Sequence, residues 1–296
     1  MKIVVLGAAA GGGFPQWNVA STNNRLSFAG DPNCPSSTQC SLAVSLNGDD
    51  WLLLNASPDI RQQILATPEL HPKRSPRSSP IKAIILTGAD IDAIIGLLSL
   101  RERQPLVVWA TDYVLRVIRA SAVFNVLDRD LVQFRAIPAN GDFEPLAGIV
   151  CHPLECPGKP PLYMEDTHGI DPVEGSSIGV RLTSNNGKSL VFMPSCAEIT
   201  LNILMTLEGT DALFFDGTLC VDDEMIRTGE GFKTSRRMGH VSMDQSIGLL
   251  RDIKVGARFF IHINNTNPTL NRHSPERKII EDAGWVIAED GMRLEL

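Results

Sequence analysis

An apolar run that leads into two closely spaced acids is the feature that most constrains the fold of this 296-residue chain. Residues 81–86 are almost all apolar and rich in isoleucine, which is typical of a buried strand. A short polar stretch, Thr-Gly-Ala-Asp-Ile-Asp, follows, and apolar residues then recur at helical spacing up to residue 96. The segment 81–96 therefore predicts a buried strand, a polar loop and a helix, with Asp90 and Asp92 at the end of the strand.

This loop resembles the metal-binding loop of metallo-β-lactamase-like hydrolases, in which His-x-His-x-Asp-His directly follows a threonine. Here the threonine is Thr87, the three histidine positions hold Gly88, Asp90 and Ala93, and Asp92 stays in register. The resemblance implies an α/β fold, an αββα sandwich of two mixed β-sheets flanked by helices. The missing histidines argue against two-zinc hydrolase chemistry, which needs a metal-bound hydroxide.

The composition excludes several classes of partner. A net charge of −7 argues against nucleic acid or an anionic membrane. No apolar run approaches the ~18 residues of a membrane span. The chain starts with a strand-like run at residues 2–6, so no signal peptide is expected. None of the six cysteines forms Cys-x-x-Cys, which favours reduced thiols in a cytoplasmic protein.

Short apolar runs and helical patterns alternate irregularly along the chain. Strands are predicted at 2–6, 41–46, 51–55, 82–86, 106–110, 178–182, 189–193, 212–216 and 258–263. Helices are predicted near 58–66, 91–102, 112–125, 198–207 and 242–252. Clustered strands with helices between them suit two helix-covered sheets better than a regular doubly wound sheet. We expect a single domain over residues 1–296.

Two further predicted strands end in groups that can bind a metal. The run 211–216 ends at Asp216, and the run 258–262 ends at His262. Groups on strand ends are held in place by the sheet, so these side chains can meet at a shared ion. The alternative is that each one caps a helix or satisfies a buried amide. The predicted metal ligands are Asp90, Asp92, Asp216 and His262.

Two loops are candidates for ligand binding. The glycine-rich stretch 7–13 does not have the G-x-G-x-x-G spacing of a dinucleotide site, and the following Phe-Pro-Gln-Trp does not open a helix. Glycines such as Gly12 and Gly13 suit a loop packed closely beside a ligand. The stretch 228–240 contains Arg236, Arg237 and His240, which can hold a carboxylate-rich ligand. A solvated basic loop is an equally weighted alternative.

Six blocks of sequence resemble the B proteins of pyrroloquinoline quinone (PQQ) biosynthesis. They include the unusual strings Asn-Ala-Ser-Pro-Asp and His-Ile-Asn-Asn-Thr-Asn-Pro and lie at 6–18, 54–61, 96–102, 215–218, 238–240 and 262–268. The resemblance covers nearly the whole chain and agrees with a metallo-β-lactamase-like fold. It implies a substrate derived from a cross-linked Glu–Tyr pair, and two roles: metal-dependent oxidation or hydroxylation of this precursor, or transport of PQQ or its precursor toward the periplasm.

The chain departs from many members of that family. They carry a cysteine cluster that resembles a zinc knuckle, whereas Cys34 and Cys40 alone cannot make a four-ligand site, so structural zinc is not expected. They also carry Asp-His where this chain has Asp92 and Ala93. A third histidine position, in a Gly-His-x-Pro-Gly turn, falls on Glu155.

The remaining groups form an oxygen-rich set, which favours Fe(II) or another hard divalent ion over zinc. His240, His262 and Asp216 can form the two-histidine, one-carboxylate triad of non-haem iron oxygenases. We predict catalytic roles for His240 and Arg237. The residues predicted to bind substrate are Gly12, Gly13, Asn18, Arg236, Asn264 and Asn265.

A non-catalytic carrier with the same pocket and no metal is the alternative. Gly88 and Ala93 at former ligand positions are easier to explain if no dinuclear site is needed. The partners implied by the resemblance are PQQ or its peptide-derived precursor and other PQQ biosynthesis proteins. The sequence leaves a homodimer open.

Overall fold

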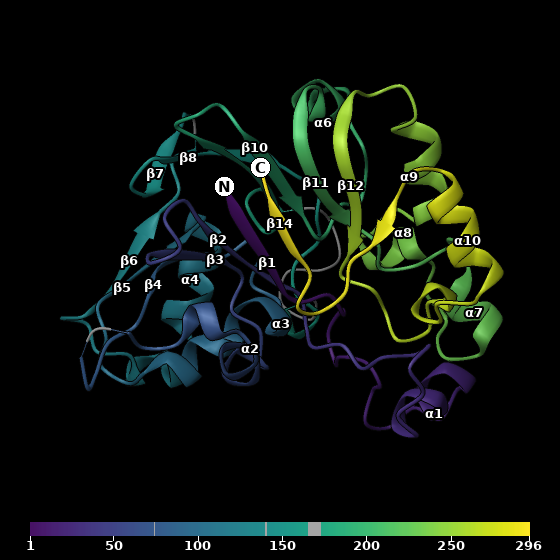
Figure 1. Ribbon diagram of the computed structural model, residues 1–296, viewed down its shortest axis with the longest axis horizontal. Helices are drawn as coiled ribbons and strands as arrows, with labels where there is room; N and C mark the ends of the chain where they lie inside the picture. Colours follow the sequence, from purple (N-terminus) through teal and green to yellow (C-terminus); the bar gives the residue numbers. More distant parts are fainter. Residues whose placement is uncertain (74, 140, 165–172) are drawn as a thin grey trace.

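Two seven-stranded sheets form the framework of the molecule. The computed structural model describes residues 1–73, 75–139, 141–164 and 173–296 (Figure 1). The first sheet runs in the order β14 (Arg293–Glu295), β1 (Lys2–Gly7), β2 (Ser41–Ser45), β3 (Trp51–Leu54), β4 (Ile81–Ile85), β5 (Leu106–Ala110) and β6 (Val132–Ala136). The second runs in the order β13 (Val286–Ile287), β12 (Val255–Ile261), β11 (Thr210–Asp216), β10 (Ser189–Met193), β9 (Ile178–Ser184), β8 (Ile149–Glu155) and β7 (Phe143–Leu146).

Both sheets are mixed. In the first, β3 to β6 are parallel neighbours, while β1 pairs antiparallel with β2 and β14. In the second, β10 to β13 are parallel, and β7 to β10 are joined by antiparallel pairs. Because parallel strands point the same way, the carboxyl ends of β3 and β4 meet at one edge, as do those of β11 and β12.

The apolar residues of the strands divide between three buried layers. On β1, Ile3 and Val5 join the core between the two sheets, while Val4 and Leu6 pack on the helix side. This division follows from the two-residue period of a strand, and it explains why these strands are apolar on both faces. The core between the sheets also receives Phe214 from β11. The predicted αββα sandwich is therefore confirmed.

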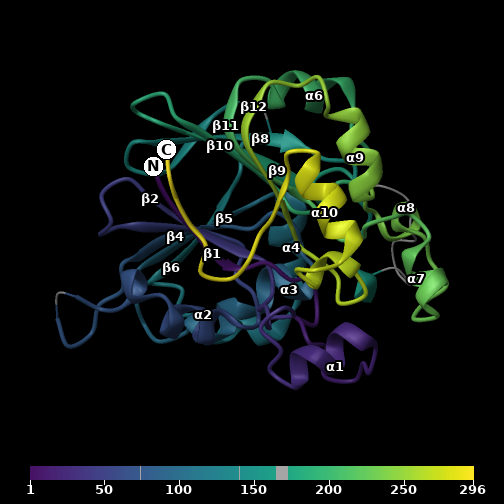
Figure 2. The same ribbon diagram turned by 45° about the vertical axis from the view of Figure 1, so that its right-hand side comes forward.

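Helices cover the outer face of each sheet (Figures 1 and 2). The first sheet is covered by α2 (Ile60–Ala66), α3 (Ile91–Ile94) and α4 (Asp112–Ala120). The second is covered by α6 (Leu201–Leu207), α9 (Met243–Leu249) and α10 (Pro275–Asp282). Three further helices lie in connections: α1 (Thr22–Phe28), α7 (Glu224–Thr228) and α8 (Ser235–Met238).

Each of the nine predicted strands overlaps an observed one, and the five predicted helices are also present. The strands that pattern reasoning missed are β6, β7, β8, β13 and β14. β6 lies at a sheet edge and exposes Gln133 and Arg135, and β8 exposes His152 and Glu155, so neither has a continuous apolar run.

The two ends of the chain lie side by side in both views (Figures 1 and 2). β14 pairs antiparallel with β1, and the amino group of Met1 donates to the carbonyl of Leu296 at 2.6 Å.

Among the described residues, no helix is both long and apolar enough to cross a bilayer.

The two sheets are joined at the edge where β4, β11 and β12 end. Ala9 forms β-bridges with Gln39 and with Ile263. A further bridge links Gly88, after β4, to Ser177, before β9. These main-chain contacts hold loops from both sheets against one another, so side chains on them have fixed relative positions.

Gly96 sits where the helix after β4 meets the loop after β3. A Cβ atom added there would lie 2.1 Å from the carbonyl oxygen of Ser57 and 2.6 Å from that of Ala56. Both obstacles are backbone atoms, so they cannot move aside as a flexible side chain can. The amide of Gly96 also donates to the Ala56 carbonyl at 2.8 Å, which fixes the approach.

We predict that Gly96→Ala lowers the free energy of unfolding by about 2 kcal/mol or more, because overpacking forces the backbone to shift. Urea unfolding followed by circular dichroism measures the change. Gly248→Ala in α9 is the matched control, because nothing lies within 4 Å of its added Cβ. Alanine there should be neutral or stabilise by about 0.5–1 kcal/mol. Equal stabilities of the two variants would contradict the close packing.

Candidate metal centre

A cavity of about 470 Å³ opens where the strand ends of the two sheets meet. Its lining includes four of the groups singled out from the sequence: Asp90, Asp92, His240 and His262. Thr218, Asn264 and two lysines, Lys159 and Lys233, also line it. The cavity therefore combines carboxylates, imidazoles and cationic side chains within one enclosure.

Each ionisable group is carried by the end of a regular element. Asp90 and Asp92 follow β4, and Asp90 is the N-cap residue of α3. Asp216 is the last residue of β11, and His262 directly follows β12. His240 follows Gly239, which ends α8 with a left-handed φ of 90°. Such a glycine terminates a helix without steric penalty, which places the histidine just beyond it.

The backbone of His262 is in the left-handed region, with φ of 63°. This conformation costs on the order of 1–3 kcal/mol for a residue with a side chain, so the surroundings must enforce it. The enforcing contacts come from the next residue: the amide of Ile263 donates to Ala8 at 2.8 Å, and its carbonyl accepts from Ala10 at 2.8 Å. The glycine-rich loop thus clamps the residue after the histidine.

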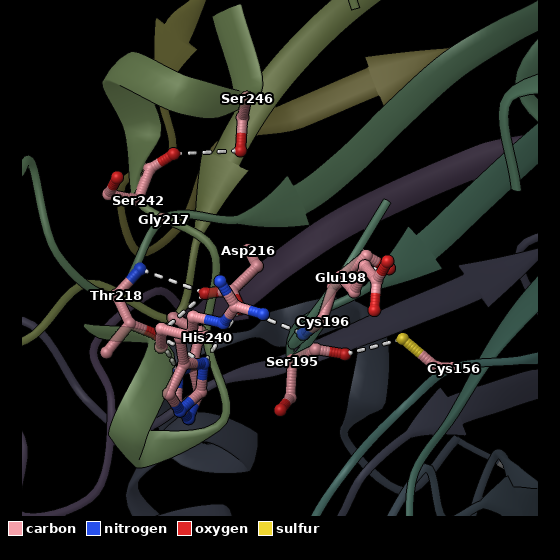
Figure 3. Close-up of polar contacts among 12 residues, drawn as sticks. Cys156, Ser195, Cys196, Glu198, Asp216, Gly217, Thr218, His240, Ser242 and Ser246 are labelled. Carbon is pink, nitrogen blue, oxygen red and sulfur yellow. Dashed lines mark hydrogen bonds and ion pairs between the residues drawn. The ribbon is translucent and has the colours of Figure 1, made fainter. Parts of the chain in front are cut away.

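Asp216 is fully buried, and both of its carboxylate oxygens are saturated with hydrogen bonds (Figure 3). Oδ1 accepts from the amide and the hydroxyl of Thr218, at 3.1 and 2.7 Å. Oδ2 accepts from the amide of Cys196 at 2.8 Å and from Nδ1 of His240 at 2.7 Å. The carboxylate therefore holds His240 in place, and an ion could use it only by displacing one of these donors.

Thr218 connects the two histidines. Its hydroxyl oxygen lies 3.1 Å from Nδ1 of His240 and 2.8 Å from Nδ1 of His262. The two imidazole rings stack, with centroids 5.4 Å apart and an interplanar angle of 23°. Asp216, Thr218 and His240 point toward one another in Figure 3.

Asp92 and His262 form a close pair in the cavity wall. The Oδ2 atom of Asp92 lies 2.9 Å from Nε2 of His262, and both side chains are about 15% exposed. Burial favours the neutral forms, but the hydrogen bond and the opposite charge outweigh it. They hold the pKa of Asp92 below its ordinary value and raise the pKa of His262 above its ordinary value.

These residues can hold a divalent metal ion. Asp216, His240 and His262 each offer one ligand atom, and the three atoms lie within 4.8 Å of one another. Two ligands at right angles on an ion at ~2.1 Å lie about 3.0 Å apart. The 2.9 Å separation of Asp92 Oδ2 and His262 Nε2 matches that spacing. The donor set consists of carboxylate and imidazole groups, which fits one hard or borderline ion.

The structure does not bring Arg236 and Arg237 into the cavity. Both lie on α8 with exposed side chains, and the described lining includes neither of them. The cationic groups that do line the cavity are Lys159 and Lys233. Neither lysine belongs to a recognisable sequence motif, so only the folded structure could identify Lys159 and Lys233 as cavity residues. The predicted roles of the two arginines stay predictions.

In the glycine-rich loop, the described lining of the cavity includes Gly11 but not the predicted substrate-binding residues Gly12 and Gly13. Gly11 lines it, and a Cβ added there would lie 3.8 Å from Asp92. Gly12 and Gly13 follow in the same loop with φ of 94° and 71°. The amide of Gly12 donates to the side chain of Gln39 at 3.0 Å. Asn18 lies further along and is exposed.

The two predicted asparagines differ in role. Asn265 is buried, accepts a hydrogen bond from Asn24 and donates to Gln16, so it anchors the N-terminal segment. Asn264 lines the cavity, and its Nδ2 donates to the hydroxyl of Thr266 at 2.7 Å. Of these two asparagines, Asn264 is therefore the one that the structure places in the cavity wall.

Comparison with known proteins is consistent with this geometry. Residues 50–263 match the model of the Beta-lactamase superfamily domain, which places the fold in that superfamily. The chain is 46% identical to coenzyme PQQ synthesis protein B of Methylorubrum extorquens, over 100% of both chains. The chain belongs to the family of coenzyme PQQ synthesis protein B.

Solved structures agree with this assignment. A crystal structure of Zn(2+)-bound PqqB from Methylobacterium extorquens superposes with a TM-score of 0.97 at 46% identity, covering 100% of both chains. A diphosphatase from the PhnP family has a TM-score of 0.71 at 20% identity, covering 100% of this chain and 97% of the other. The second likeness shows the fold alone.

Glu224 is a buried acid next to the site that sequence reasoning missed. Its two carboxylate oxygens accept from the amide of Cys220 and from the hydroxyl of Thr266, both at 2.6 Å. Burial raises the pKa of Glu224 to about 7. Thr266 in turn accepts from Asn264, so Glu224 supports a residue of the cavity wall.

We predict that Glu224→Gln changes how stability depends on pH. A glutamate has a pKa of about 4.3 in the unfolded chain. A raised folded pKa gives stability that is complete below about pH 4.3 and is lost as pH rises through 7. Relative to the variant, the native protein should lose on the order of 3 kcal/mol of unfolding free energy as the pH rises from about 4.3 to about 7. Urea unfolding from pH 5 to 8 measures it, with Glu295→Gln, an exposed acid on β14, as control. Parallel pH curves for native protein and Glu224→Gln would contradict the raised pKa.

Proposed function

We propose that this protein acts in PQQ biosynthesis by metal-dependent oxidation or hydroxylation of the Glu–Tyr-derived precursor. The observation that supports the proposal best is the Asp92–His262 pair, whose facing atoms lie 2.9 Å apart in the wall of the cavity. His240 lines the same cavity. Membership of the family supports a role in the PQQ pathway. The carboxylate and imidazole groups of the cavity support metal-dependent chemistry.

Asp92 and His262 are the residues best placed to hold the ion, with Asp90 and His240 beside them. Fe(II) suits this mixture of carboxylate and imidazole ligands and leaves open positions for other ligands. When bound, the ion supplies a Lewis-acidic, redox-active centre. Asp216, predicted as a ligand, is better used to support His240, since all its lone pairs already accept hydrogen bonds.

His240 is the group placed to move a proton. Asp216 accepts a hydrogen bond from its Nδ1, which leaves Nε2 with a lone pair that no described residue occupies. Nε2 can accept the proton of a substrate phenol, and the buried carboxylate stabilises the imidazolium that results. This is the catalytic role predicted for His240 from the sequence, and it remains a proposal.

The cationic wall of the cavity suits a substrate with several carboxylates. Lys159 and Lys233 line the cavity, whereas Arg236 and Arg237 are exposed outside its lining. A charge-assisted hydrogen bond from an ammonium group to a carboxylate is stronger than a neutral one. We therefore assign the carboxylate-binding role first to Lys159 and Lys233.

A metal-free carrier of PQQ or its precursor is the second candidate. It is favoured by one observation: Gly88 and Ala93, at two former histidine positions, both line the cavity and offer no ligand atoms. The same cavity and lysines then hold the ligand without chemistry. The two candidates differ in whether a metal is required.

Metal content separates them. We expect about one equivalent of iron in tag-free protein produced in iron-, manganese- and zinc-supplemented medium without chelators. His262→Ala should lose the iron and activity on the precursor, while circular dichroism shows a folded protein. His273→Ala is the matched control and should keep the iron, because this histidine is exposed and lies outside the described lining of the cavity.

The assay for activity supplies precursor, dioxygen and a reductant such as ascorbate. Hydroxylation places one oxygen atom of dioxygen into a C–H bond, and the other leaves as water after taking two electrons from the reductant. Less than about a tenth of an equivalent of any metal, even after anaerobic iron loading, would contradict the oxygenase. Binding of PQQ by that metal-free protein would then support the carrier.

The choice of lysines over arginines can be tested directly. We predict that Lys159→Ala raises KM for the precursor by about 10-fold or more, the loss expected for one hydrogen bond to a charged group. The kcat should change less, because the lysine binds the substrate in both ground and transition states. Arg237→Ala is the comparison: a larger effect there would support the role predicted from the sequence.

A further inference from the structure

Strand β6 is the last strand of the first sheet and has an open edge (Figure 1). It pairs with β5, and no other strand of the described chain pairs with it. The carbonyl of Leu131 accepts from β5 at 3.0 Å, and the amide of Ile137 donates to β5 at 2.8 Å. Because backbone groups alternate in direction along a strand, Phe134 and Ala136 direct theirs away from β5, toward the open edge.

A groove of about 550 Å³ lies between β6 and the end of α4. Its lining combines apolar side chains, among them Phe124, Leu127 and Phe134, with the two arginines Arg119 and Arg129. Successive side chains of a strand point to opposite faces of the sheet. A strand added beside β6 would therefore place every second side chain next to Phe134, in this groove.

Three arginines near the open edge give it an excess of positive charge. Arg119 and Arg129 line the groove, and Arg135 is exposed on the opposite face of β6. Arg129 and Arg135 each donate to a neutral side-chain oxygen at 2.9 Å. Among the described carboxylates, none forms an ion pair with any of the three. Residues 116–135 contain four arginines and two aspartates, in a chain whose net charge is −7.

We propose that the open edge of β6 and its groove bind an extended acidic peptide by strand addition. The peptide backbone pairs with the outward groups of Phe134 and Ala136, and its apolar side chains enter the groove. Its carboxylates meet Arg119, Arg129 and Arg135.

A second copy of this chain fits the edge less well than an acidic peptide. Pairing two β6 edges would bring their arginines together, and like charges on neighbouring strands are destabilising. None of the groove or edge residues belongs to the described lining of the cavity at the metal centre. The proposal therefore goes beyond the metal-dependent function and does not rest on it.

The charge of the surface is tested with a fluorescein-labelled peptide of alternating glutamate and valine, whose binding is followed by fluorescence anisotropy. Native protein should bind this peptide. The double variant Arg119→Glu/Arg129→Glu should bind it about 10-fold or more weakly, because two attractive contacts become repulsive. Arg251→Glu is the matched control, since it reverses an exposed charge after α9, and it should bind within about twofold of native.

The pairing of the backbone is tested in two ways. Ala136→Pro removes an amide that faces the open edge, a position where proline is tolerated, so it should weaken binding by about fivefold or more. Circular dichroism checks that this variant folds. Two further peptides carry N-methyl groups either on every valine or on every glutamate. Only one set of amides can face β6, so one methylated peptide should bind about 10-fold more weakly than the other.

Equal binding by native protein and the double arginine variant, or no binding by native protein, would overturn the proposal. Equal binding of the two methylated peptides would also overturn it, because charge alone would then hold the probe. A dimer seen by sedimentation that is lost in Ala136→Pro would assign the edge to a second copy instead of a peptide. These measurements need neither metal nor turnover, so a failure here is distinguishable from a failure of the metal-centre function.

Discussion

The carboxylate of Asp216 is the group on which the site depends. It is fully buried at the end of β11, where an unpaired charge would cost several kcal/mol. Its four donors come from three separate segments: the turn of Thr218, the loop of Cys196 after β10, and His240 after α8. Satisfying one charge therefore requires three loops to converge, and the histidine is oriented as a result.

A second constraint acts on the backbone at strand ends in each of the two sheets. Two residues other than glycine in the described lining of the cavity have left-handed backbones, Asn55 after β3 with φ of 65° and His262 after β12 with φ of 63°. Asn55 holds Thr87 through its amide oxygen, which accepts from the Thr87 amide at 2.8 Å. Each strained residue thus lies where a loop of one sheet is fixed against its neighbour. Strain of this kind persists only where the surroundings enforce it.

The metal-binding capacity of the site depends on which ligand groups of the metallo-β-lactamase-like motif the chain retains. Relative to the motif of metallo-β-lactamase-like hydrolases, the chain lacks all three histidines of the loop after β4, and small residues line the cavity at two of those positions. The carboxylate Asp92 is retained and is matched to His262 from the opposite sheet at 2.9 Å. The retained carboxylates and histidines can hold a divalent metal ion, and Asp216 orients His240 within the site.

The sequence by itself determined the sandwich and the strand-end acids. Short apolar runs bounded by turn residues predict buried strands from the local sequence, and the strings around Asn55 and His262 identify the family. Tertiary structure alone decided which polar groups meet. Lys159 and Lys233 reach the cavity and Arg236 and Arg237 do not, because the direction of a loop depends on distant packing. Glu224 and Thr218 acquire their roles from contacts 42 and 44 residues away, and hydrogen bonds between such distant residues leave no local pattern in the chain.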